Sequence, residues 1–434
     1  MTEGQPAAAA ATSEAPVAPP SLVHPYVHVI AVGLIGAVSV LAWLIVFELG
    51  NKVLWENEVI LANPWLFPAI CLPFSLLVGL LVKRRHAPTN LDESLMDSLS
   101  GDVTKIDWRA LPVNIVMAWA SLFSGAVLGP EGGIGGIGSK IAILYADKVG
   151  IPVQERSRLV FATLASAYNG LIANPLFTGV LGTELISDPE ARKRNLPANL
   201  IGGTIGFIVF YLAGNTGLYD FLHLTATERI GPTELLVVVP LALVGLVLAL
   251  ALGALMQVVA TAFARLKGRE VERALLGGII FSAVGMVAPI LLFSGETQVQ
   301  EVVADPAKYG AGTLVAMALV KLALLAVAFK GGFLGGPTFP AIFASTCVAL
   351  AIGLVFPGLR VDVLIGAVMA GFLMVLFRAP LMVILLTTVM LQAEPDLIAL
   401  IVLAVATVMV VMPVVQAVVA RRQASRGHVS EGDA

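Results

Sequence analysis

The segment Leu128-Gly-Pro-Glu131-Gly-Gly-Ile-Gly135 places a carboxylate directly after 21 residues, Ala110 to Pro130, that contain no charged side chain. An ionisable side chain inside a membrane span costs about 2.5–3.5 kcal/mol on insertion scales and commonly marks an ion or proton pathway. The Gly and Pro residues around Glu131 also predict that one helix ends and another begins within the bilayer. Irregular backbone of this kind is tolerated only where protein or a water-filled cavity surrounds it.

The composition of the chain predicts an integral membrane protein. Hydrophobic residues make up 58% and charged residues 13%, with a mean hydropathy of +0.92, whereas soluble domains contain about 25% charged residues. The apolar windows are continuous rather than alternating, which argues against a β-barrel and predicts an all-α fold. Windows long enough to cross about 30 Å of hydrocarbon lie at residues 29–47, 59–82, 110–130, 159–183, 196–219, 235–264, 274–295, 331–359 and 397–420.

The distribution of charge predicts an orientation in the membrane. Basic clusters follow apolar windows at residues 83–85, 265–269 and 421–422, whereas the first loop between windows carries three glutamates between residues 48 and 58. The positive-inside rule then puts both termini of a multi-pass protein in the cytoplasm, with the chain in the cell membrane. The formal net charge of −3 gives no support for a nucleic-acid partner.

The termini and the reactive side chains predict few accessory features. Residues 1–24 are rich in Ala, Pro and Ser and are interpreted as a disordered cytoplasmic tail, and residues 423–434 as a short cytoplasmic tail without a regulatory domain. Cys71 and Cys347 lie in apolar segments, which indicates buried free thiols rather than a disulfide or a metal pair. The histidines lack metal-ligand spacing and no catalytic triad is recognisable, so we expect no enzyme activity, no metal and no cofactor.

Two pairs of motifs predict an internal duplication. Pro175 follows Gly129 by 46 residues, and Pro380 follows Gly335 by 45 residues, with two apolar helices in each interval. The alternative is coincidence among 42 Gly and 25 Pro residues. Duplicated transporters commonly bind substrate at the repeat interface, where broken helices point their N-termini at an anion. We therefore expect two membrane repeats, residues 25–220 and 221–422.

The helix beginnings at Glu131 and after Gly336 favour an anion. Each leaves backbone N–H groups without an intrahelical acceptor and carries about half a positive charge. Glycines let an ion approach the main chain closely. The carboxylate of Glu131 could occupy the same site and leave it on protonation, which would couple H+ to anion movement. The alternative is a first-turn acid in an exposed loop that stabilises its helix by less than ~1 kcal/mol.

These motifs resemble those of the CLC family of chloride channels and anion/proton antiporters. Leu128-Gly-Pro-Glu-Gly-Gly is similar to the family's Gly-x-Glu-Gly-Pro signature, and Ala173-Asn-Pro-Leu to its Asn-Ala-Pro-Leu segment. Gly335-Gly-Pro-Thr-Phe-Pro resembles Gly-Gly-x-Phe-x-Pro, and Arg378-Ala-Pro-Leu resembles a late family segment. The resemblance covers residues 27–420 and implies a divergent bacterial-type member: a homodimer with one pore per subunit and two inverted-topology repeats with broken helices.

The resemblance also implies roles for individual residues. Glu131 matches the external gating glutamate, and Glu184 falls within about one position of the acid that passes protons from the inside in antiporters. For Glu184 the alternative is a membrane-boundary glutamate before a polar loop. The implied anion ligands lie around the two helix beginnings and are Gly129, Gly132, Gly133, Ile134, Gly335, Gly336, Thr338 and Phe339.

Three departures from the family pattern concern the same site. The Gly-Ser-Gly-Ile-Pro motif is missing, and Thr89 or Asn90 could present a hydroxyl or an amide in place of its serine ligand; a polar loop that caps the next helix is the alternative. Asn90-Leu91 also resembles part of the Asn-rich motif of the fluoride-exporting branch. Thr338 aligns with the family's Phe when Pro340 is matched. The family's central tyrosine has no counterpart, because the last Tyr is Tyr309, so we expect a different inner gate.

We therefore predict transmembrane transport of a small inorganic anion, with chloride expected, in exchange for protons and with Glu131 as the gate. The alternatives are a passive chloride channel gated by voltage or pH, a fluoride/proton antiporter, and a membrane scaffold that keeps the fold without transport. The expected partners are the anion, protons, a second copy of the chain and the lipid bilayer. Lys321, inside an apolar segment, is expected to be structural.

Overall fold

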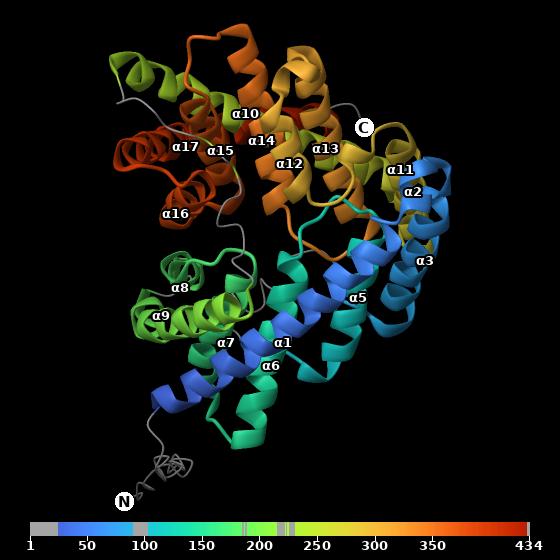
Figure 1. Ribbon diagram of the computed structural model, residues 1–434, viewed down its shortest axis with the longest axis vertical. Helices are drawn as coiled ribbons and strands as arrows, with labels where there is room; N and C mark the ends of the chain where they lie inside the picture. The colour runs from blue at the N-terminus through green and yellow to red at the C-terminus, as the bar shows by residue number, and fades with distance from the viewer. Residues whose placement is uncertain are drawn as a thin grey trace, which may run out of the picture.

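The computed structural model of the protein describes residues 25–89, 103–184, 186, 189–214, 222, 224 and 231–431. These residues form helices joined by turns, with one isolated β-bridge, and the predicted all-α fold is confirmed (Figure 1). In this part of the chain, seven helices have the length and apolar composition needed to cross a membrane. The nine predicted windows therefore do not all form single spans.

The helices divide into two sets that pack internally in the same way. In each set one helix, α7 or α15, packs against four others: α7 contacts α1, α6, α8 and α9, and α15 contacts α10, α14, α16 and α17. Likewise α5 packs on α6 as α13 packs on α14. An internal duplication predicts this pattern, although the boundary at residues 220 and 221 lies outside the described residues and stays a prediction. The first set is α1 (Pro25–Leu54), α2 (Glu58–Ala62), α3 (Phe67–Arg85), α5 (Leu111–Phe123), α6 (Glu131–Val149), α7 (Val153–Ala167), α8 (Pro175–Glu184) and α9 (Pro189–Leu212). The second is α10 (Pro232–Phe263), α11 (Glu270–Val287), α12 (Glu296–Ala304), α13 (Ala311–Gly331), α14 (Thr338–Val355), α15 (Val361–Phe377), α16 (Pro380–Leu391) and α17 (Pro395–Glu431).

The apolar window at residues 110–130 contains a helix that stops partway. Helix α5 has 13 residues, which is about 20 Å at 1.5 Å per residue and too short to cross the hydrocarbon. The chain leaves the helix at Gly125, whose φ of +76° suits glycine, and starts α6 at Glu131. The window at residues 331–359 begins in the same manner, with Gly332 at φ +89° before α14. Broken helices thus form where Gly and Pro interrupt apolar sequence.

The two sets meet along α3 and α11, which lie side by side in Figure 1. Small residues allow this close approach: a Cβ on Gly79 would lie 2.6 Å from Cα of Val271, and a Cβ on Gly278 would meet the side chain of Ser75. Membrane helices associate through such small residues because lipid provides no hydrophobic drive between helices. This contact holds the two sets together and fixes how their broken helices face each other.

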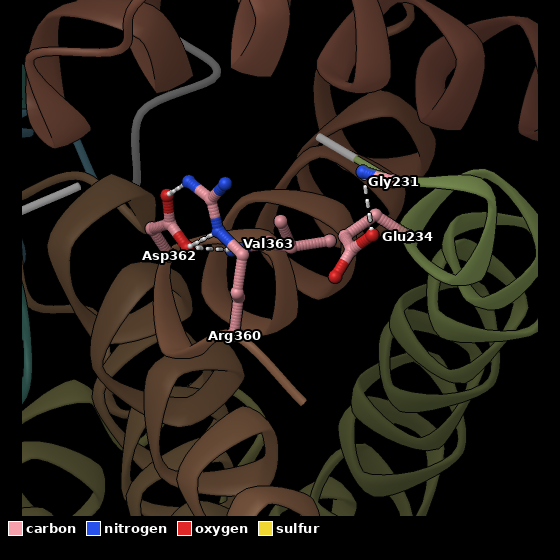
Figure 2. A network of polar contacts seen from close by, with 5 residues as sticks. All are labelled: Gly231, Glu234, Arg360, Asp362 and Val363. Atoms are coloured by element: carbon pink, nitrogen blue, oxygen red, sulfur yellow. Dashed lines mark hydrogen bonds and ion pairs between the residues drawn. The ribbon is translucent and has the colours of Figure 1, made fainter. Parts of the chain in front are cut away.

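Away from that junction, acidic side chains accept hydrogen bonds from backbone N–H groups at the N-termini of α10 and α15 (Figure 2). Glu234 of α10 accepts a hydrogen bond from the N–H of Gly231 at 2.8 Å. Asp362 of α15 accepts from the N–H of Val363 at 2.9 Å and pairs with Arg360 at 2.6 Å. Acids near helix N-termini stabilise them by about 0.3–1 kcal/mol. By contrast, α6 and α14 begin without a side-chain cap from their N-cap residues.

Candidate functional site

The beginnings of α6 and α14 meet through an antiparallel bridge between the loops that precede them. The N–H of Gly129 donates to the carbonyl of Gly336 at 2.8 Å, and the N–H of Gly336 donates to the carbonyl of Gly129 at 2.8 Å. The loops are closely packed, because a Cβ on Gly335 would lie 2.6 Å from Cβ of Leu128. The predicted motifs of the two halves therefore come together as an opposed pair of helix beginnings.

The carboxyl group of Glu131 lies between these two helix beginnings. The residue is 6% exposed, and its carboxyl faces the hydroxyl of Thr338 and the main-chain N–H groups of Thr338 and Phe339. Neither carboxylate oxygen reaches full hydrogen-bond geometry, and both are buried. A Cβ on Gly129 would lie 2.6 Å from Cδ of Glu131, and a Cβ on Gly336 2.5 Å from it, so both glycines make room for the carboxyl. This group fills the space that the predicted anion would need.

The predicted residues on α6 take different positions. Gly132 faces the second loop, since a Cβ there would lie 3.0 Å from Cα of Gly335. Gly133 faces the opposite way, where a Cβ would lie 2.9 Å from Ala118 and 3.0 Å from the ring of Trp43. The N–H of Ile134 donates to the carbonyl of Pro130 at 3.0 Å and is already engaged. Of these three residues, Gly132 is therefore the best placed to approach an ion between the loops.

The first turn of α14 offers two amides. Pro340 has no N–H, and the N–H of Ala341 donates to the carbonyl of Pro337 at 3.0 Å. The N–H groups of Thr338 and Phe339 are therefore those that point towards the space occupied by the Glu131 carboxyl. The predicted ligand Asn90 lies outside the described residues.

Glu184, at the end of α8, links α8 to α16, the two helices that begin at the paired prolines Pro175 and Pro380. Its Oε1 accepts from the N–H of Leu381 at 3.0 Å and its Oε2 from the N–H of Met382 at 2.7 Å. These amides belong to the first turn of α16, so the carboxylate satisfies two donors that the helix itself cannot. Charge-assisted bonds of this kind are among the stronger hydrogen bonds in proteins. Glu184 therefore stabilises the α8–α16 contact.

A cavity of about 620 Å³ is lined by residues of both helix beginnings and by two cationic side chains. Glu131, Tyr168, Thr338 and Phe339 line it together with Lys330 and Arg378. Most of the remaining wall is apolar and comes from both halves of the chain: Leu164, Leu171, Ile172, Phe177, Leu181, Ala249, Leu252, Met256, Phe329, Val375, Leu376, Phe377, Met382 and Leu386. A buried carboxyl and two cationic side chains therefore share one largely apolar cavity.

Tyr168 is a residue of this site that the sequence analysis missed. It follows α7, is 6% exposed, and its hydroxyl donates to the main-chain carbonyl of Glu131 at 3.0 Å. The neighbouring Asn169 amide donates to the carbonyls of Ala165 and Gly203 at 2.9 Å each, which fixes the turn. No motif or spacing marks Tyr168, because its contact with Glu131 depends on how the chain turns after α7.

Two further ionisable residues, Lys321 of α13 and Glu296 of α12, lie close to this site. The sequence analysis did not connect them to it. Lys321 is fully buried, and its Nζ donates to the carbonyls of Leu291 at 3.2 Å and Leu292 at 2.8 Å. The Nζ also lies 4.7 Å from the centre of the Phe343 ring. These contacts fit the expected structural role. Glu296, the first residue of α12, lies within electrostatic range of both Lys321 and Glu131.

The fold and the opposed helix beginnings define a CLC-type anion transport protein rather than an enzyme. The family model described as voltage gated chloride channel matches residues 74–412. That match covers well over half of the 434 residues. The chain therefore belongs to this family and is a multi-pass integral membrane protein.

Individual relatives agree with this assignment. The protein named "Putative ion-transport protein YfeO" of Escherichia fergusonii is 24% identical over 362 residues, which cover 79% of this chain and 83% of that protein. The protein of the same name from Escherichia coli K12 is 23% identical over 363 residues, with coverage of 79% and 83%.

Two solved structures share the fold. The crystal structure of a slow cyanobacterial Cl−/H+ antiporter superposes with a TM-score of 0.75 at 21% identity, over 90% of this chain and 95% of that chain. The crystal structure of a CLC-type fluoride/proton antiporter superposes with a TM-score of 0.69 at 16% identity, over 88% and 94%. At these identities the likeness confirms the predicted fold and does not distinguish between the two anions.

Proposed function

We propose that this protein exchanges a small inorganic anion, chloride, for protons, and that Glu131 is its gate. The observation that carries the proposal is the position of the Glu131 carboxyl, which lies between the beginnings of α6 and α14 and faces the Thr338 and Phe339 amides. A carboxylate and an anion compete for the same N–H groups and the same positive helix ends. Only one of them can occupy the space at a time.

Protonation then becomes the step that opens the site. A neutral carboxyl group has less attraction to the amides of Thr338 and Phe339, so an anion can take its place. When the anion leaves, the carboxyl group releases its proton on the other side of the membrane. It then returns to the site as the ionised carboxylate. The cavity provides the approach from the face that carries Lys330 and Arg378, and Glu184 beside it is proposed to take up protons from that face.

The orientation and the assembly are part of the proposal. The basic clusters that follow α3 and α10 favour the cytoplasm for the face with Lys330 and Arg378, with both termini inside the cell. Helices α8, α9, α16 and α17 gather on one flank (Figure 1) and expose apolar side chains such as Leu176, Ile208 and Val410. This flank is proposed as the contact with a second copy of the chain.

The test is an ion flux assay on protein in liposomes, with chloride, fluoride and nitrate in parallel and proton movement recorded. We expect a chloride gradient to drive protons uphill in the wild type. Glu131→Gln keeps the size of the side chain but removes its titration, so we expect anion flux to persist while proton movement is lost. Gly312→Ala is a matched control, because a Cβ there meets open space, and it should behave as the wild type.

Each other outcome assigns a different function. Anion flux without uphill proton movement in the wild type would refute exchange and favour a passive channel. Proton movement driven by fluoride but not by chloride would make the protein a fluoride/proton antiporter, as in one of the two structural relatives. If no halide passed at any pH, and Glu131→Gln changed nothing, the protein would be a membrane scaffold.

A further inference from the structure

Glu296 is an acidic residue near the gate that the exchange cycle described above does not use. It is the first residue of α12, which packs beside α14 (Figure 1). The preceding Gly295 lies against α14, because a Cβ there would stand 3.1 Å from Cβ of Phe343. Phe343 follows Phe339 by four residues and therefore lies on the same side of α14, one turn further along. The start of α12 thus lies about one helical turn from the amides that face Glu131.

The loop that precedes α12 holds Glu296 in this place. The N–H of Phe293 donates to the carbonyl of Gly125 at 3.4 Å, and Gly125 belongs to the loop that leads into α6 and Glu131. Lys321 of α13 donates to two further carbonyls of the loop before α12, at 3.2 and 2.8 Å. The two loops that lead into Glu131 and Glu296 are therefore joined to each other, and the second is also fixed to α13.

Three ionisable groups form a cluster around Glu296. Glu131 and Lys321 both act electrostatically on its carboxyl, which the hydroxyl of Ser294 also faces. Cys347 of α14 is a further titratable group beside Lys321. With one ammonium in the cluster, the total charge is zero when the two carboxyl groups hold one proton between them. Burial disfavours net charge, so the cluster favours a single proton that the two acids share.

Glu296 lies on the side of the gate away from the cavity. Lys330, which lines the cavity, is in the last turn of α13. Lys321 lies nine residues earlier, which is about 14 Å at 1.5 Å per residue, and α12 leads into the start of α13. Glu296 is partly exposed, whereas Glu131 is 6% exposed. Of these two acids, Glu296 is therefore the one placed to exchange protons with water on the face opposite Lys330.

We propose that Glu296 carries protons between Glu131 and the face opposite Lys330 and Arg378. In this step the O–H bond of the Glu131 carboxyl breaks and an O–H bond forms on the Glu296 carboxylate, directly or across one water molecule. Glu296 then gives the proton to water on that face and becomes ionised again. Lys321 balances the charge of whichever carboxyl group is ionised. This role rests on the proposed exchange, and it assigns the outer step of proton transfer to a second residue.

The experiment compares uphill proton movement and chloride flux in liposomes for the wild type and Glu296→Gln. The amide keeps the size of the side chain but cannot take up the proton, so we expect proton movement to fall at least about tenfold while anion flux persists. Glu296→Asp retains a carboxyl group and should recover part of the proton movement. Glu301→Gln is the matched control on the same helix. Its carboxylate is exposed and bonds Lys308 and Tyr309 instead, so this variant should behave as the wild type.

Infrared difference spectra test the shared proton without any transport. A pH step applied to the full chain in lipid nanodiscs reports which carboxyl groups gain or lose protons. Glu131→Gln, Glu296→Gln and the double variant complete a cycle with the wild type. Because interacting groups titrate as a pair, we expect the carboxyl signals of the cycle to be non-additive.

The outcomes separate this inference from the proposed function. Normal proton movement in Glu296→Gln, beside a wild type that couples chloride to protons, would overturn the role of Glu296 and leave the exchange intact. Equal loss of proton and anion flux in Glu296→Gln and Glu296→Asp would make Glu296 a structural residue. If the wild type moved no protons uphill, the proposed exchange would fail. In that case a non-additive infrared cycle would still support the shared proton, and an additive one would refute it.

Discussion

Substituting Gly129 by alanine tests whether the Glu131 carboxyl lies between the two helix beginnings. The added Cβ would stand 2.6 Å from Cδ and 2.6 Å from Oε1 of Glu131, and the three nearest atoms all belong to this carboxyl. Ordinary carbon–carbon contact is about 3.5 Å, so the group must withdraw by about 1 Å. Overpacking at a buried position costs about 1–3 kcal/mol. We expect about 1–2 kcal/mol, because a side-chain end moves more easily than backbone.

The same substitution in a Glu131→Ala background removes the cause of the strain. The clashing atoms are then absent, so Gly129→Ala should change the free energy of unfolding by less than about 0.5 kcal/mol. The double-mutant cycle should therefore report a coupling of about 1–2 kcal/mol between the two positions. Gly312→Ala, where nothing lies within 4 Å of the new Cβ, serves as the control and should be neutral or stabilising by up to about 1 kcal/mol.

The cycle is measured by reversible unfolding in mixed micelles followed by tryptophan fluorescence, with proton movement in liposomes as a second readout. A shift of 1 Å in a reacting group can lower a rate by about a hundredfold, so we expect Gly129→Ala to reduce proton-coupled flux at least tenfold. Equal destabilisation with and without the Glu131 carboxyl would refute the reasoning. Such a result would mean that this group does not touch Gly129.

Three further substitutions test the surroundings of the gate. Tyr168→Phe removes the hydrogen bond to the Glu131 carbonyl and should lower stability by about 0.5–1.5 kcal/mol and reduce discrimination between chloride and nitrate; unchanged discrimination in the flux assay would exclude it from the anion path. Glu184→Gln weakens the charge-assisted contact with α16 and should destabilise by about 1–2 kcal/mol while lowering proton flux more than anion flux; normal proton flux would leave it only its structural contact. Lys321→Met leaves two buried carbonyls without a donor, so thermal unfolding should shift downwards by an amount equivalent to about 2 kcal/mol, and an unchanged transition would contradict the structural role of this lysine.

Much of the fold was predictable because its signals are local. Uncharged apolar windows predicted membrane helices, and the Gly and Pro residues around Glu131 and Gly336 predicted where helices break. The window at residues 159–183 was harder, since it contains α7, a turn at Tyr168–Gly170 and the start of α8. Absence of charge shows that a segment is apolar but does not show where it turns, so the number of full spans could not be counted from it.

The individual residues of the site were less predictable, because one residue type serves two purposes. A glycine at a helix beginning can leave an amide open or can allow close packing, and the sequence looks the same in both cases. Gly132 faces Gly335, whereas Gly133 accommodates Trp43. The contact between Tyr168 and Glu131 joins residues 37 positions apart and depends on the packing of α6 and α7. Only the three-dimensional structure relates such positions.

The two helix beginnings occupy corresponding places in the two sets of helices but differ in chemistry. The first turn of α6 starts with an ionisable residue, Glu131, whose carboxyl is accommodated by Gly129 and Gly336. The first turn of α14 has no acid; it offers the Thr338 hydroxyl and two amides, and Pro340 removes the third N–H. One side thus supplies a movable charge and the other a fixed receptor. Two acids facing each other would repel, and two receptors would bind an anion without any means of releasing it by protonation. The asymmetry between the repeats, rather than their symmetry, is therefore what makes proton-coupled exchange chemically reasonable at this site.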